Sequence, residues 1–266
     1  MATPQPTPAL RPPGWAALRA WWQGWREVLH FGAQILVLSL SVSSWRRAQR
    51  RVIVRTAYQA TMPLLPVFTV ISALVGVVII RIVIATALSY GLARYALDVL
   101  VRTLVLELIP LSAALFAALR YAMPSGAAVR AMRLRGEFET LLAQGHDPTR
   151  DRVLPRAAAA MFAVITLAAV SGAVTLILAY LSVYGFSAWG LGAFTRTVGH
   201  VFGPVIVLIF CLKTVFLSLA VAIIPMVPTP DDHAGGNAVN AEITRLARLL
   251  AVVLLIEMVS LVGNYY

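Results

Sequence analysis

The sequence predicts an all-α integral membrane protein, in which an N-terminal interfacial amphipathic helix precedes five transmembrane helices. Of the 266 residues, 60% are hydrophobic and only 12% are charged, and the mean hydropathy is +0.82. Such a composition is typical of membrane proteins. The second observation is a series of five long apolar runs, and the third is that most arginines lie between these runs. A cytoplasmic helix is expected between the second and third spans.

The N-terminal part is expected to contain a tail and an interfacial helix. Residues 1–14 contain five prolines, which predicts a disordered tail, and residues 15–266 are expected to form one membrane domain. Within residues 15–44, apolar residues recur at helical three-four spacing, with arginines on the opposite face. These positions are Trp15, Leu18, Trp22, Trp25 and Leu29. The pattern predicts an amphipathic helix in the membrane interface, and the alternative is a surface helix packed on the protein's own core.

Each of the five apolar runs is long enough to cross a hydrocarbon core of about 30 Å at about 1.5 Å per helical residue. The predicted spans are residues 62–90, 99–123, 157–181, 201–226 and 246–263. Arginines are most frequent before the first span and between the second and third, where seven occur from Arg120 to Arg156. The positive-inside rule therefore predicts a cytoplasmic N-terminus, a cytoplasmic bend over these residues and an external C-terminus.

The formal net charge of +11 does not indicate nucleic-acid binding. The arginines flank apolar spans and form no basic face with interleaved exposed aromatic residues, which is the pattern of nucleic-acid-binding proteins. The four histidines and the single cysteine show no metal-ligand spacing, so no metal site is expected.

Four charged residues lie inside the predicted spans and away from the span ends, where each charge is costly and needs an explanation. Glu107, Lys213 (the only lysine of the chain) and Glu257 are expected to form a buried ionic cluster that either fixes helix packing or switches during transport. A static structural pair is the alternative. Pro110 removes one helical N–H near Glu107 and leaves a carbonyl free. Arg81 is expected to reach the outer headgroups or to face a lipid-filled cavity.

The polar segment between the second and third spans has a helical pattern over residues 125–144, and Gly145 follows as a stop signal. Apolar residues form one stripe, and arginine and glutamate residues supply the polar surface. A helix of this kind can dock in a groove of a soluble partner. The alternative is an interfacial helix that only caps the bundle.

Several short motifs resemble the MlaE (YrbE) family of ABC-transporter permeases, which move phospholipids or other lipids with MCE-domain partners. The motifs, in family order, are Glu107-Leu108-Ile109-Pro110, Arg120, Met132-Arg133, Asp147-Pro148 followed after six residues by Pro155-Arg156, Lys213-Thr214, Gly235-Gly236 and Glu257. The resemblance covers about residues 15–264 and rests on order and spacing. Leu106 stands where the family usually has arginine, and residues 121–124 replace its glycine-rich turn, so the chain resembles a divergent member.

The resemblance implies a permease subunit of an ABC transporter that moves phospholipid or another lipid between the bacterial inner membrane and the periplasm or outer envelope. The expected partners are a second permease copy, identical or paralogous, a cytoplasmic ABC ATPase, an MCE-domain protein and a small cytoplasmic STAS-like protein. The chain has no phosphate-binding glycine loop. It is therefore expected to be no enzyme and to bind no cofactor, with ATP and Mg used by the ATPase. The N-terminus is expected in the cytoplasm and the C-terminus in the periplasm.

The resemblance also implies roles for single residues. The bend is expected to act as a coupling helix for the ATPase, with a set of candidate contacts along it. These are Arg120, Arg130, Met132, Arg133, Arg135, Phe138, Leu141, Asp147 and Pro148. Two copies would enclose a lipid cavity lined by spans one, two and five, with Arg81 as a candidate headgroup contact.

Two other classes of function stay open from the sequence. A non-transporting membrane scaffold that anchors a soluble complex would have a closed bundle, whereas a permease would have a lipid-sized cavity. An intramembrane enzyme is weaker, because no His/Asp/Glu or Ser/His set recurs at catalytic spacing.

Overall fold

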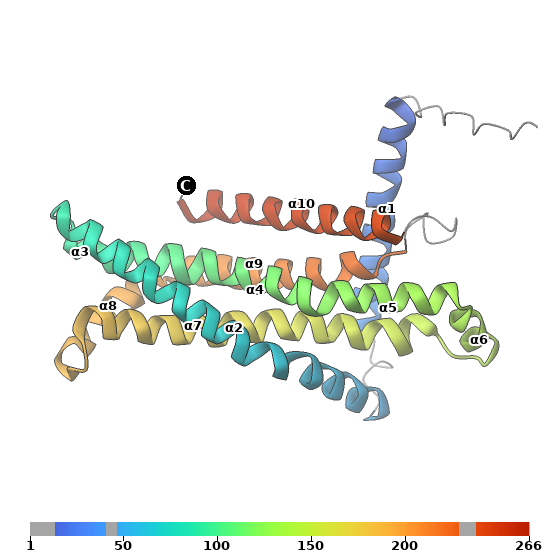
Figure 1. Cartoon of the computed structure of the whole chain (residues 1–266), viewed down its shortest axis with the longest axis horizontal. Coiled ribbons are helices and arrows are strands. Elements are labelled where there is room, and N and C mark those ends of the chain that lie inside the picture. Colours follow the sequence, from blue (N-terminus) through green and yellow to red (C-terminus); the bar gives the residue numbers. More distant parts are fainter. Residues whose placement is uncertain (1–13, 41–46, 229–237, 266) are drawn as a thin grey trace, which may run out of the picture.

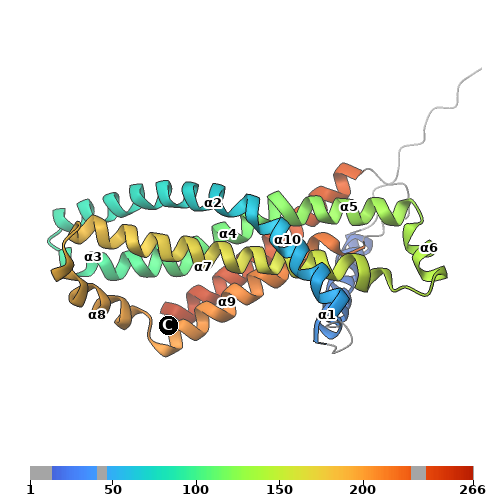
Figure 2. The same ribbon diagram turned by 90° about the horizontal axis from the view of Figure 1, so that it is seen from below.

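The computed structural model describes residues 14–40, 47–228 and 238–265, and no strand occurs in these three ranges. Apart from Gly14, the tail predicted over residues 1–14 lies outside the described residues. The long helices form an elongated bundle, with α6 at one end and α3 and α8 at the other (Figures 1 and 2). We call these the α6 end and the α8 end.

The described helices follow one another with few long connections. The α-helices are α1 (Gly14–Leu40), α2 (Arg47–Ser89), α3 (Ala93–Leu100), α4 (Ile109–Ala117), α5 (Met123–Leu134), α6 (Glu137–Ala143), α7 (Leu154–Tyr184), α8 (Leu191–Val201), α9 (Pro204–Ile223) and α10 (Ala238–Tyr265). Three π-helical segments, η2 (Val101–Leu108), η3 (Ala118–Ala122) and η4 (Thr149–Val153), and two 3-10 turns, η5 (Ala188–Gly190) and η6 (Ile224–Met226), lie between them.

Five helical stretches of the described chain are long and apolar enough to cross a membrane, which confirms the all-α fold class with five such helices. They are Gln49–Ser89, Tyr95–Leu134, Thr149–Tyr184, Pro204–Met226 and Val239–Asn264. The second stretch is much longer than the predicted span, because α3, η2, α4, η3 and α5 join end to end without a loop. The membrane helix therefore continues directly into the bend.

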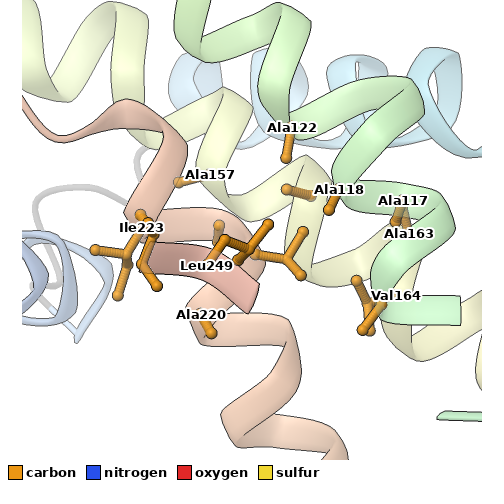
Figure 3. Packing of buried hydrophobic residues seen from close by; sticks show 14 of the residues in the cluster. Ala117, Ala118, Ala122, Ala157, Ala163, Val164, Ala220, Ile223 and Leu249 are labelled. Atoms are coloured by element: carbon orange, nitrogen blue, oxygen red, sulfur yellow. The ribbon is translucent and has the colours of Figure 1, made fainter. Parts of the chain in front are cut away.

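Small side chains bring the second and third stretches close together. Ala117, Ala118 and Ala122 are fully or almost fully buried and lie in one apolar cluster with Ala163 and Val164 of α7 (Figure 3). Alanine at a helix contact lets two backbones approach closely, which drives helix association where lipid tails are as apolar as leucine. This contact fixes the central pair of helices, against which α9 packs.

The N-terminal helix α1 runs across the bundle and crosses the direction of α7 and α10 (Figure 1). Val28, Phe31 and Ile35 are buried in the main apolar cluster, whereas Trp22 and Val37 are exposed. One face of α1 is thus packed on the protein's own core. The placement of its exposed face in a membrane interface stays a prediction.

The bend differs from the single helix predicted over residues 125–144. Its helix is interrupted at Gly136, which has a left-handed backbone with φ of 73°. Glycine adopts this conformation without the steric cost that a Cβ would impose. The bend therefore consists of α5, which continues the second span, and the short helix α6, which turns away from it (Figure 2). A second left-handed residue, Gly145, follows α6 with φ of 77°.

Candidate functional site: a buried charge cluster between three helices

The three charged residues predicted to pair inside the spans lie together in the structure. Lys213 of α9 has its Nζ 2.9 Å from Oε1 of Glu257 of α10, and it also contacts Oε2 of Glu107 of η2. The side chains of Lys213, Glu107 and Glu257 are 1%, 9% and 12% exposed. Three helices far apart in sequence therefore meet at one ammonium group.

The backbone around Pro110 supplies the third partner of the lysine. In the preceding π-helical segment the Ile109 N–H donates to the Leu104 carbonyl. Proline has no N–H, so the Leu106 carbonyl four residues before Pro110 has no α-helical donor. Lys213 Nζ donates to this carbonyl at 3.4 Å. The three N–H donors of the ammonium thus have three acceptors, two carboxylates and one backbone oxygen.

A fourth side chain, which was not predicted from the sequence, holds the other oxygen of Glu107. Asn264 Nδ2 donates to Glu107 Oε1 at 2.6 Å. Asn264 follows Glu257 by seven residues, which places both on one face of α10 because seven residues make about two helical turns. That spacing is the one signal in the sequence that could have placed Asn264 in the cluster.

The cluster contains two carboxylates and one ammonium, so its cohesion depends on the lysine. Burying charged groups is costly unless they are paired and hydrogen-bonded. Oε2 of Glu257 is buried and has no hydrogen-bond partner among the described residues. The cluster is therefore less fully satisfied on the Glu257 side than on the Glu107 side.

An apolar groove of about 410 Å³ lies beside the cluster, between α9 and α10. Lys213 lines it together with apolar side chains that include Leu212, Phe216, Leu255 and Val259. This groove is formed by spans four and five of one chain. The cavity expected from the sequence lies between two copies and is lined by spans one, two and five, and it stays a prediction.

The predicted contact residues of the bend divide into buried and exposed ones. Arg130 is 7% exposed and Pro148 is also buried. Arg133 Nη2 donates to the Met226 carbonyl at 3.2 Å, and its guanidinium lies 5.2 Å from the Phe138 ring centre. These two arginines do not form the polar surface that the helical pattern predicted, because Arg130 is buried and Arg133 reaches back to the end of α9.

The other candidate contacts are more accessible. Arg135 is exposed and bonds Glu137 at 3.3 Å. Asp147 accepts a hydrogen bond from the Thr149 N–H at 3.0 Å, which stabilises the turn that leads into η4. Met132, Phe138 and Leu141 are half-buried, and Arg120 is exposed beside a small groove of about 240 Å³ near Tyr121.

Arg81 lies apart from the charge cluster. It is exposed on α2, where Leu74, Val78 and Ile82 are exposed as well. Its guanidinium is therefore surrounded by an apolar helix face and lies eight residues before the end of α2 at Ser89.

Comparison with known proteins assigns the family. No curated protein matches the chain significantly. The sequence profile described as Permease MlaE matches residues 53–263, a range that includes the three charged residues of the cluster and the described helices from α3 to α9. The chain thus belongs to the MlaE permease family and, with its five long apolar helices, is a multi-pass membrane subunit of an ABC transporter.

Proposed function

We propose that this permease moves phospholipid or another lipid between the inner membrane and the periplasm or outer envelope, together with an MCE-domain partner. The observation that carries this proposal is the apolar groove of about 410 Å³ with Lys213 in its wall. Ligand pockets typically have volumes of about 300–1,000 Å³ and combine apolar walls with a few placed polar groups. An acyl chain fits the apolar part of the groove, and Lys213 and Ser260 supply polar groups in its wall.

The transporter needs a second permease copy, identical or paralogous, and a cytoplasmic ABC ATPase that uses ATP and Mg. The α2 helix supports the need for a second copy, because most of its apolar stretch is not buried within one chain. Arg81 on this helix is a candidate contact for a lipid headgroup. A small STAS-like protein is a further candidate partner on the cytoplasmic side.

The ATPase docks at the α6 end, which places the N-terminus in the cytoplasm and the C-terminus in the periplasm. The arginines between the second and third spans favour this orientation. Leu134 and Leu142 are 59% and 61% exposed, and Arg135 and Glu139 lie beside them on the bend. Exposed leucines rimmed by charges are the pattern of a helix that fits a groove of a partner.

Changing these leucines tests the docking surface. The double variant Leu134→Glu and Leu142→Glu should lose co-purification of the ATPase by at least about tenfold, because apolar anchors at the centre of an interface typically contribute about 2 kcal/mol each. Pull-down of the ATPase with tagged permease measures the effect. Leu191→Glu, an equally exposed leucine at the α8 end, is the control and should retain the ATPase. If the double variant retained the ATPase fully, α6 would not be part of the docking surface.

Transport itself is tested with the whole complex in proteoliposomes. ATP-dependent movement of a fluorescent phospholipid to acceptor vesicles is the expected result. A complex that binds the ATPase and hydrolyses ATP but moves no lipid would favour the scaffold function instead.

Pro110→Ala separates lipid transfer from stability. Alanine at this position supplies a backbone N–H that would compete with Lys213 for the Leu106 carbonyl. A hydrogen bond to a charged group contributes about 1.5–3 kcal/mol, and we expect lipid transfer to fall about tenfold. The unfolding temperature should not fall, because alanine is the better helix former. Pro124→Ala at the start of α5 is the control, and equal transfer in both variants would contradict this role of Pro110.

A further inference from the structure

The end of α9 nearest to the bend is a buried turn. Ile224, Met226 and Val227 are 3%, 1% and 1% exposed, and α9 tightens here into the 3-10 turn η6. The last carbonyls of a helix have no intrahelical donor. When such carbonyls are buried, they need partners from elsewhere in the fold.

The bend supplies one of these partners and a direct backbone contact. Arg133 of α5 donates to the Met226 carbonyl at 3.2 Å. Two helical turns earlier on α5, Gly126 lies against the Pro225 carbonyl so closely that a Cβ at this position would be 2.1 Å from the oxygen. The backbone of α5 therefore rests on the backbone of the turn, without an intervening side chain that could adjust.

A second arginine, from α10, bonds the same turn, and α1 contacts Arg133. Arg245 of α10 is 2% exposed and donates to the Val227 carbonyl at 3.4 Å. The Phe31 ring of α1 lies 6.0 Å from the Arg133 guanidinium. Cations at the C-terminal end of a helix interact favourably with its dipole, and charge-assisted hydrogen bonds are stronger than neutral ones. Two arginines from separate helices thus donate hydrogen bonds to carbonyls of the turn.

The helix beyond the turn leads directly to the charge cluster. α9 is one helix from Pro204 to Ile223, and Lys213 lies ten residues before its end, or about 15 Å along the axis. A packed helix moves as a rigid body rather than bending over so short a distance. A displacement of the turn therefore moves Lys213 relative to Glu107 and Glu257.

We propose that Arg133 and Arg245 are positioning residues that clamp the Ile224–Val227 turn, so that movement of the bend is passed to α9 and to the Lys213 cluster. This inference rests on the proposed function, because it requires an ATPase that moves the bend. It gives Arg133 a different role from docking, since its guanidinium is engaged inside the permease. The ATPase touches the exposed part of the bend, and the clamp transmits the resulting movement of the bend to α9.

The single cysteine of the chain provides a reporter for movement of α9. Cys211 is exposed and lies two residues before Lys213. The rate of its modification by a small maleimide, followed by intact mass of the permease, is measured in the full complex without nucleotide and after trapping with ATP and vanadate. In the wild type we expect the two rates to differ by at least about fivefold, the lower end of typical coupling between sites.

The clamp predicts how this difference responds to substitution. Arg133→Gln should retain the ATPase and its hydrolysis of ATP, but the nucleotide-dependent difference at Cys211 should disappear, together with lipid transfer. Arg133→Lys keeps a charged donor, so its nucleotide-dependent difference in the modification rate of Cys211 should be intermediate. This variant replaces Arg133→Gln in the test if the glutamine variant does not fold. Arg196→Gln, a change at an exposed arginine of α8, should behave as the wild type.

The outcomes separate this inference from the proposed function. A full nucleotide-dependent difference at Cys211 in Arg133→Gln and Arg133→Lys would overturn the clamp while leaving the transporter intact. A wild-type complex that transfers lipid without any change at Cys211 would also overturn it. Absence of ATPase binding and of lipid transfer in the wild type would instead reject the proposed function.

Discussion

Lys213→Leu should lower the unfolding temperature of the purified permease by on the order of 10 °C and abolish lipid transfer. The substitution leaves Glu107 and Glu257 buried beside each other without their shared cation. Breaking a buried ion pair by removing one partner costs about 3–5 kcal/mol, and about 1 kcal/mol shifts the midpoint by about 2–4 °C in a chain of this size. Thermal unfolding in detergent and lipid transfer in proteoliposomes measure the two effects. Leu208→Met, a change at an exposed residue of α9 that does not line the groove, is the control.

A neutral version of the cluster then distinguishes packing from switching. The triple variant Lys213→Leu, Glu107→Gln and Glu257→Gln has no charge in the cluster, so most of the lost stability should return. Lipid transfer should stay low if the ion pairs must break and re-form in each cycle. Wild-type transfer by the triple variant would show that the cluster only holds α9, α10 and η2 together.

Gly126→Val should destabilise the permease by about 3 kcal/mol, because overpacking a close contact forces the backbone to move. The oxygen that a Cβ would meet belongs to the Pro225 backbone, so no side chain can rotate away. The unfolding temperature of the purified protein measures this effect. Gly192→Val in α8 is the matched control, since a Cβ there has nothing within 4 Å. Equal stability of the two variants would mean that α5 does not rest on the turn.

The sequence is most informative where an unpaired charged or polar group would be costly in an apolar environment and therefore requires a bonding partner. A charge within an apolar run must be compensated, so Lys213, Glu107 and Glu257 can be grouped from the sequence alone. The long apolar runs predict five helices for the same reason, since their backbone groups have no water to bond in a bilayer. Proline chemistry even predicts a free carbonyl near Glu107, although not that it belongs to Leu106 or that the lysine binds it.

The sequence is less informative where the outcome depends on tertiary distance. Arg130 and Arg133 occupy polar positions of a helical pattern. The long arginine side chain, however, can lay its aliphatic part along apolar surface and turn its guanidinium inward when acceptors lie within reach. Gly136 fits the interior of one helix by pattern, and only its left-handed backbone shows that the bend has two. Asn264 lies at the end of the last span, where a polar residue is ordinary, so its position alone does not indicate a partner inside the bundle.

The continuous second span, Tyr95–Leu134, has 40 residues, or about 60 Å at about 1.5 Å per residue, which is about twice the thickness of a hydrocarbon core. Under the proposed clamp, this span would act as a lever with its fulcrum at the contact of Gly126. Glu107 lies 19 residues away, or about 28 Å along the arm. A tilt of about 5° about the fulcrum would swing Glu107 sideways by about 2.5 Å, which is close to the full length of a hydrogen bond. A small displacement of the bend, which lies on the other side of Gly126, would thus be enough to part the Glu107 carboxylate from Lys213.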